Sequence, residues 1–199
     1  GFTREEQDAW AITSTTRAQA AIRSGAFQWE IAPVTVAGRK GEVTISDDEQ
    51  PPKANIEKIP SLKPAFKKDG TVTPANSSSI SDGAAALVLM RASTAERLGA
   101  KPIARIVGHT NHAGLPANFP TAPVGAMQKL LDKAGWSVGD VDLWEINEAF
   151  AVVTMAAIRD LALDPAKVNI HGGACALGHP IGACGARIIV TLLGALRKT

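Results

Sequence analysis

The sequence has few cysteines, almost no net charge and no long hydrophobic run, and each shortage excludes a class of protein. Its longest apolar candidate, residues 188–196, is far shorter than the ~18 residues that a membrane-spanning helix needs. The 21 Lys and Arg residues nearly balance the 19 Asp and Glu residues, so the net charge of +2 indicates neither nucleic acid nor a membrane surface as a partner. Two cysteines and no signal-peptide pattern predict reduced thiols in a cytoplasmic protein.

Patterns typical of helices and strands alternate along the chain. Thr3 and Glu6 have capping-box spacing, which predicts a helix over residues 4–24 that Gly25 ends. Further helices are predicted over 93–99, 123–135, 148–161 and 181–197, and strands over 31–36, 84–90, 103–107, 141–146 and 168–170. The strand at 84–90 is expected to be buried, because it is continuously apolar. This alternation predicts a layered α/β fold.

The stretch from residue 37 to residue 76 shows neither pattern and is rich in proline and charge. A long irregular segment in a compact domain usually crosses the surface and binds a ligand. A passive connector has the same composition, so both interpretations stay open.

The densest group of chemically versatile residues lies in 171–187, which holds both cysteines, two of the four histidines and five glycines. His179 is expected between a strand and a helix, where α/β proteins bind ligands. It is either a catalytic base beside backbone amides or a histidine buried against a closely packed helix. Cys175 and Cys184 favour a structural role over a nucleophilic one. With His171 they could instead form a metal site, although the spacing matches no common zinc pattern.

Two polar segments complete the candidates. Asn147 stands between a predicted strand and a predicted helix, where it either caps the helix or holds a catalytic water or substrate oxygen. The helix dipole would stabilise Glu148 next to it, so no catalytic role is predicted for that carboxylate. The serine-rich turn at 76–83 either only forms a turn or contacts a polar ligand.

Four of these segments together resemble the thiolase family: residues 4–9, 81–86, 147–150 (Asn-Glu-Ala-Phe) and 172–187. They occur in the family's order along the whole chain and are most similar to its acetyl-CoA acetyltransferases. The resemblance implies a thiolase-like layered α/β/α fold that is incomplete. Residues 1–76 would be the end of a CoA-contacting loop domain, 77–100 the last strand and helix of the N-terminal half, and 101–199 a truncated C-terminal half.

The resemblance also implies a reaction. Thiolases condense two acetyl-CoA molecules to acetoacetyl-CoA and CoA, or run the reverse thiolytic cleavage, through an acyl group on a cysteine. His179 would be the base that activates this cysteine and would help to form an oxyanion hole, and Asn147 would hold the oxyanion-hole water. Contacts with CoA or the acyl group would come from four further residues: Ser78, Leu62, Phe66 and Phe150.

By the same resemblance, neither Cys175 nor Cys184 is a catalytic cysteine. Cys184 stands where the family often has Ser, and His171 where many members have Asn. The chain alone is therefore expected to be inactive and to need the remaining part of a thiolase chain. Acetyl-CoA and acetoacetyl-CoA are the expected partners, coenzyme A thioesters are substrates with no further cofactor, and the parent enzyme is expected to be a homodimer or homotetramer.

Two alternatives to the enzyme remain open. One is a non-catalytic, CoA-binding protein of the same fold. The other is a metal-binding module built on four residues: His171, Cys175, His179 and Cys184.

Overall fold

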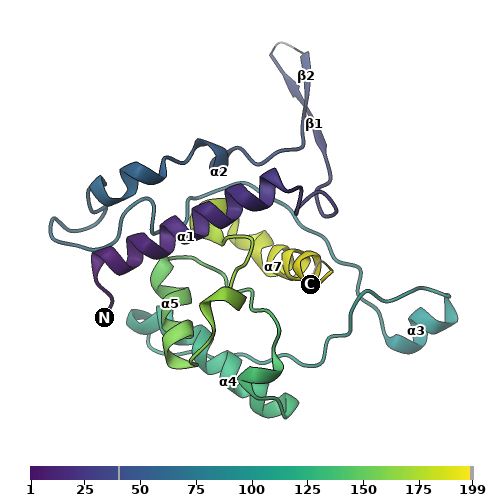
Figure 1. Ribbon diagram of the computed structural model, residues 1–199. Helices are drawn as coiled ribbons and strands as arrows, with labels where there is room; N and C mark the ends of the chain where they lie inside the picture. Colours follow the sequence, from purple (N-terminus) through teal and green to yellow (C-terminus); the bar gives the residue numbers. More distant parts are fainter. Residues whose placement is uncertain (40, 198–199) are drawn as a thin grey trace.

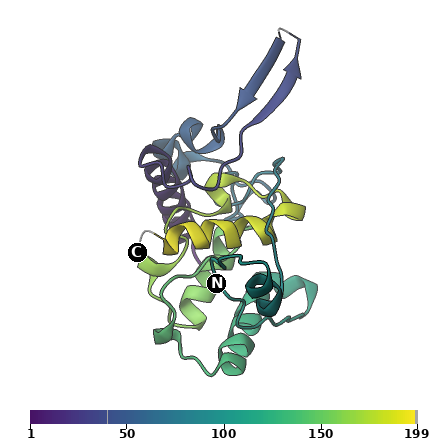
Figure 2. The ribbon, with the colours of Figure 1, turned by 90° about the vertical axis from the view of Figure 1, so that its right-hand side faces the viewer.

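The computed structural model describes residues 1–39 and 41–197. Four long helices form its body: α1 (Arg4–Arg23), α4 (Ala122–Ala134), α5 (Ala151–Asp160) and α7 (Ile181–Leu196) (Figure 1). An antiparallel hairpin of β1 (Val34–Gly38) and β2 (Gly41–Ile45) projects from this body, as the turned view in Figure 2 shows. None of the helices in the described part of the chain is both long and apolar enough to cross a membrane.

Shorter helical segments connect these parts. They are α2 (Gln50–Lys53), η1 (Ile56–Ser61), α3 (Ala92–Arg97), η2 (Pro116–Thr121), η3 (Val138–Asp140), η4 (Pro165–Lys167) and α6 (Ala174–Leu177). The region 37–76, expected to lack regular structure, therefore contains β2, α2 and η1. The short helix α6 was not expected, because its Ala-Cys-Ala-Leu sequence is too short to show a periodic pattern.

The predicted boundaries of the long helices are confirmed where a capping group determines them. Thr3 and Glu6 form the capping box at the start of α1, and Gly25 follows its end with a φ of +66°. Gly135 adopts the left-handed conformation that ends α4. The helix predicted over 181–197 is α7.

Three boundary predictions were wrong. The strand predicted over 31–36 is β1, which begins at Val34. The helix expected from Ser93 to Gly99 is α3, and its N-cap is Arg91 without a side-chain hydrogen bond. The helix expected to start at Glu148 is α5, whose N-cap is Phe150. Asn147 therefore does not cap a helix.

The main core lies between α5 and the segments around Trp144 and Val168. Trp144 and Val168 form a single parallel bridge, and the fully buried Val168 packs in one cluster with Ile146 and Val153. The Asn169 side chain extends this pairing, because it accepts from the Ile146 N–H at 2.8 Å and donates to the Ile146 carbonyl at 2.9 Å. The strands predicted over 141–146 and 168–170 thus lie side by side, but one bridge replaces a continuous ladder.

The strands predicted over 84–90 and 103–107 do not form in the described structure, and their apolar side chains are not buried. Val88 is 87% exposed and Ile103 is 67% exposed. A buried strand needs hydrogen-bonded neighbours and packed elements on its faces. The part of the chain that the structure describes places no strand beside these segments, and Figure 1 shows them leading to and from α3, away from the body.

Candidate functional site

His179 and Asn147 meet although 32 residues separate them in the sequence. His179 lies in the turn between α6 and α7, and Asn147 lies between the Trp144 segment and α5. The Nε2 atom of His179 is 3.3 Å from the Nδ2 atom of Asn147. The structure therefore brings together the two residues that the sequence singled out as a base and a water-holding amide.

The backbone before His179 needs a glycine. Gly178 has a φ of +82°, and a Cβ atom at that position would lie 2.2 Å from the Ser81 hydroxyl oxygen. The next backbone N–H, that of His179, donates to the Ser79 carbonyl at 3.1 Å. The serine-rich turn thus contacts the His179 turn directly.

The second ring nitrogen of His179 faces a thiol. Its Nδ1 atom is 2.8 Å from the Sγ atom of Cys184, which is 3% exposed on α7. The Asn147 Oδ1 atom is buried and has no hydrogen-bond partner in the described structure. A buried amide oxygen without a partner is a position where a water or a ligand group is expected.

Glu148 is the central acceptor of this region, a role that the sequence pattern did not predict. Its carboxylate is fully buried and accepts from the Ser14 hydroxyl at 2.6 Å, from the Cys175 N–H at 3.1 Å and from the Trp10 indole. The helix-dipole interpretation was wrong, because α5 begins only at Ala151. Trp10 and Ser14 lie on one face of α1 at i, i+4 spacing, which is the signal that could have revealed a buried polar partner.

Both cysteines are buried, although Cys184 lies next to His179. Burial raises the pKa of the Cys175 thiol well above its usual value, and the nearby Glu148 charge raises it further. Cys184 is sealed behind His179. His171 packs its ring edge-on against Phe27, with the ring centres 5.6 Å apart.

The metal-site alternative finds no support in the geometry. Across residues 1–39 and 41–197, no three His, Cys, Asp or Glu side chains are placed to hold a metal ion. The His171, Cys175, His179 and Cys184 side chains therefore do not converge on one point.

Two of the four predicted CoA or acyl contacts join the Asn147 segment. The Ser78 hydroxyl donates to the Ala149 carbonyl at 2.9 Å, and the Phe150 ring packs against Phe119 with centres 5.9 Å apart. Leu62 accepts a hydrogen bond from Arg4 at the start of α1, and the Phe66 ring is 77% exposed. Within the described residues, Leu62 and Phe66 have no hydrogen bond or ring contact with the His179–Asn147 pair.

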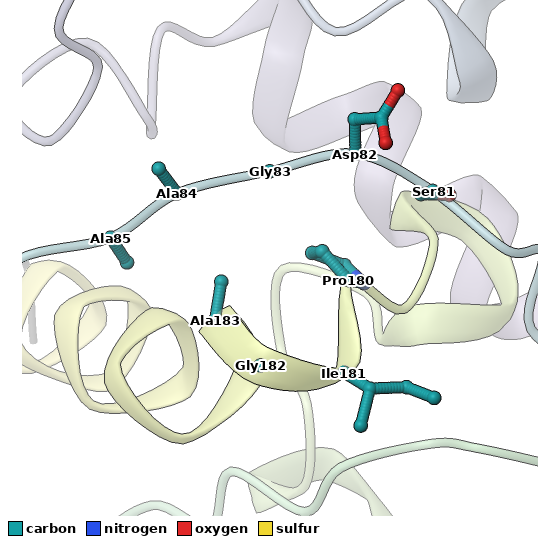
Figure 3. Close-up of a pocket in the computed structure, with 9 residues that line it drawn as sticks. All are labelled: Ser81, Asp82, Gly83, Ala84, Ala85, Pro180, Ile181, Gly182 and Ala183. Carbon is teal, nitrogen blue, oxygen red and sulfur yellow. The ribbon is translucent and has the colours of Figure 1, made fainter.

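A hollow of about 450 Å³ is lined in part by Pro180, the residue that follows His179 (Figure 3). Residues 81–85 form one wall and residues 180–183, at the start of α7, form the other. Figure 3 shows Pro180 and Ala183 facing the 81–85 segment, whereas Ile181 points away from it. Gly83 permits this approach, because a Cβ atom there would lie 2.7 Å from Pro180.

A second group of charged side chains, which no sequence pattern predicted, consists of Glu30, Glu145 and Arg187. Burial raises the pKa of Glu145 to about 8 and that of Glu30 to about 7, and the Arg187 charge lowers both. Each of the three side chains keeps one buried polar atom without a hydrogen-bond partner in the described structure. They come from distant parts of the sequence, so only the tertiary structure reveals the group.

The arrangement of these segments agrees with two family models that together cover most of the chain. Residues 1–93 match the model described as the thiolase N-terminal domain, and residues 100–199 match the model described as the thiolase C-terminal domain. The chain therefore belongs to the thiolase family.

Within the family, the chain is similar to acetyl-CoA acetyltransferases. It is 53% identical over 199 residues to acetyl-CoA acetyltransferase B, mitochondrial, of Xenopus laevis, covering 99% of this chain and 47% of that protein. It is 50% identical over 198 residues to acetyl-CoA acetyltransferase of Yarrowia lipolytica, covering 100% of this chain and 50% of that protein. The chain thus spans about half the length of the curated relatives it matches.

Solved structures confirm the predicted thiolase-like α/β fold. The Bacillus anthracis acetyl-CoA acetyltransferase superposes with a TM-score of 0.95 at 47% identity, over 99% of this chain and 50% of that one. A thiolase from Ascaris suum in complex with coenzyme A superposes with a TM-score of 0.88 at 41% identity, over 98% of this chain and 50% of that one. The division into residues 1–76, 77–100 and 101–199 stays a prediction.

Proposed function

We propose that this chain contributes half of the active site of an acetyl-CoA acetyltransferase. The reaction would be the condensation of two acetyl-CoA molecules to acetoacetyl-CoA and CoA, or its thiolytic reversal. The observation that carries the proposal is the 3.3 Å approach of His179 Nε2 to the Asn147 amide, in two segments that resemble thiolase motifs. The names of the relatives at 50% and 53% identity support the choice of substrate.

The pair suits the charge that this reaction develops. Condensation passes through an enolate, so negative charge on a thioester oxygen must be stabilised. The Asn147 Oδ1 atom is buried without a partner and can accept a hydrogen bond from a water. The second hydrogen of this water would then point at the thioester oxygen. His179 would supply a second donor after it has taken a proton from the attacking group. Loss of one such donor typically lowers the rate by ~10²–10³.

The same site would accept coenzyme A thioesters as substrates, with no further cofactor. We propose Ser78, Leu62, Phe66 and Phe150 as contacts for CoA or the acyl group. Phe150 is the best supported of these, because its ring forms an apolar surface with Phe119 beside Asn147. The Ascaris suum relative was solved in complex with coenzyme A, which supports CoA as the carrier.

The nucleophile would come from the half of the relatives' length to which this chain does not align. Burial and the raised pKa of Cys175, and the sealed position of Cys184, support a nucleophile outside residues 1–199. We further propose a homodimer or homotetramer as the active form. The cytoplasmic location stays a prediction, and the Xenopus laevis relative carries the word mitochondrial in its name.

The test uses the full-length protein that contains this chain and follows acetylation by acetyl-CoA with intact-mass spectrometry. His179→Ala is expected to abolish the acetyl adduct, and Asn147→Ala to slow acetoacetyl-CoA cleavage by ~10²–10³. His171→Asn is the matched control. The His171 ring packs against Phe27, so this substitution is expected to leave turnover unchanged. A normal acetylation burst in His179→Ala would refute the proposed role of His179.

A second measurement addresses the source of the nucleophile. Residues 1–199 alone, mixed with acetyl-CoA, are expected to form no acetyl adduct and to show no turnover. An acetyl group found on Cys175 or Cys184 would contradict the proposal. Binding of CoA by the full-length protein without any adduct or turnover would favour the non-catalytic alternative.

A further inference from the structure

Among the described residues, two side chains lie within hydrogen-bonding distance of the His179 ring nitrogens, and Cys184 makes the shorter of the two contacts. The Sγ–Nδ1 distance of 2.8 Å is shorter than the 3.3 Å that separates Nε2 from Asn147. The two ring nitrogens thus have different neighbours, a thiol on one side and an amide on the other. These neighbours determine which nitrogen carries the proton.

The hydrogen-bonding groups select one tautomer. The Asn147 amide is oriented with Nδ2, a donor, toward Nε2, and in this orientation the ring nitrogen offers its lone pair. A neutral imidazole then carries its proton on Nδ1, which donates to the Cys184 sulfur. Nε2 is left as the basic nitrogen.

The backbone holds the sulfur in a fixed place. Cys184 lies in the first turn of α7, where its N–H donates to the Pro180 carbonyl at 3.0 Å. His179 immediately precedes Pro180, so the base and the thiol flank the same hydrogen-bonded turn. The Cys184 side chain is 3% exposed, which keeps the sulfur out of reach of a substrate.

We propose that Cys184 is a positioning residue for His179. Its sulfur accepts the Nδ1 proton, fixes the tautomer and holds Nε2 toward Asn147. The tautomer is inferred from the two contacts of the ring, whereas its effect on turnover rests on the proposed function. Partners of this kind orient functional histidines and determine which nitrogen is basic.

Imidazole ¹⁵N NMR spectra of the histidine-labelled full-length protein that contains this chain test the tautomer without any assay of activity. In the parent chain the Nδ1 atom of His179 is expected to be protonated and Nε2 unprotonated at a pH where the ring is neutral, with His179→Gln used to assign the signals. Cys184→Ser keeps an acceptor and should preserve this pattern. Cys184→Ala removes the acceptor and should shift the proton toward Nε2.

Two further variants keep the test decisive. Cys184→Val fills the site with a side chain that has no hydrogen-bond acceptor, so it should behave like Cys184→Ala. It replaces the alanine variant in the test if that variant does not fold. Cys175→Ala removes the other thiol and should leave the His179 signals unchanged. An unchanged pattern in both Cys184→Ala and Cys184→Val would overturn the proposal, as would a loss of the pattern in Cys184→Ser.

Kinetics of the full-length protein supply the functional arm. Cys184→Ala is expected to lower kcat by about 10–100-fold with little change in KM, which is the range for partners that orient metal-binding histidines. Cys184→Ser should restore most of the rate. If Cys184→Ser were as inactive as His179→Ala, the sulfur would be a nucleophile and the proposal would be wrong. If the full-length protein shows no thiolase activity while the NMR pattern holds, the proposed function fails and the positioning role stands.

Discussion

Replacing Glu145 with Gln should change how the stability of this protein depends on pH. Glu145 lies two positions before Asn147, and its Oε2 atom is buried without a hydrogen-bond partner in the described structure. Burial raises its pKa from 4.5 to about 8; Arg187 opposes this rise, and Glu148 and Glu30 add to it. Glutamine has nearly the same shape and cannot ionise, so the variant isolates the cost of charging this one carboxyl.

The sign follows from proton binding in the two states. Between the unfolded pKa of 4.5 and the folded pKa of about 8, the folded chain holds a proton on Glu145 that the unfolded chain has lost. Stability therefore falls as pH rises through this window, by about 1.4 kcal/mol per pH unit for a single group. Between about pH 5.5 and about pH 7.5 the Glu145 contribution amounts to about 2.5 kcal/mol. Glu145→Gln removes this part of the slope.

Urea unfolding at a series of pH values measures the effect, with the free energy of unfolding plotted against pH for parent and variant. Glu42→Gln is the matched control, since it makes the same change on the exposed strand β2 and should leave the slope unaltered. A ¹³C carboxyl titration of Glu145 gives an independent reading, with a midpoint expected near pH 8. Parallel stability curves for Glu145→Gln and the parent would refute the reasoning.

Three further predictions concern stability and can be checked by urea unfolding. Glu148→Gln places an amide donor among the Ser14, Trp10 and Cys175 donors, so we expect the free energy of unfolding to fall by about 2 kcal/mol. A fall below about 0.5 kcal/mol would show that the carboxylate is not the central acceptor. Gly172→Ala should lower the free energy of unfolding by more than about 2 kcal/mol, because φ is +83° and the new Cβ would lie 2.5 Å from the Ser14 carbonyl. Gly182→Ala meets open space in α7 and should raise the free energy of unfolding by about 0.5–1 kcal/mol. Equal effects of the two substitutions would contradict this prediction. Thr3→Ala removes half of the capping box and should cost about 1 kcal/mol, and an unchanged unfolding midpoint would argue against it.

The long helices could be predicted from the sequence because their signals are local. A capping box, a terminal glycine and a 3.6-residue period all act within a few residues, which is why α1, α4 and α7 appear where the pattern indicates. Asn147 and His179 could be singled out because residues 147–150 and 172–187 resemble thiolase motifs, and this resemblance lies in consecutive residues of the sequence.

The buried strand and the role of Glu148 depend on contacts with distant parts of the chain. Residues 84–90 are apolar enough for a buried strand, but burial depends on neighbouring strands, and the described residues supply none beside them. The role of Glu148 could not be predicted because its donors come from α1 and from the start of α6. These donors lie far from Glu148 in the sequence and meet it only in the folded chain.

The sequence by itself determined the family, the long helices and the two residues at the centre of the candidate site. The tertiary structure decided which partners those residues meet: the thiol behind His179, the unpaired Asn147 oxygen and the group of Glu30, Glu145 and Arg187. The physical reason is range. Helix signals act over one or two turns, whereas hydrogen bonding and desolvation of a buried polar group depend on whatever the fold places within a few ångströms of it.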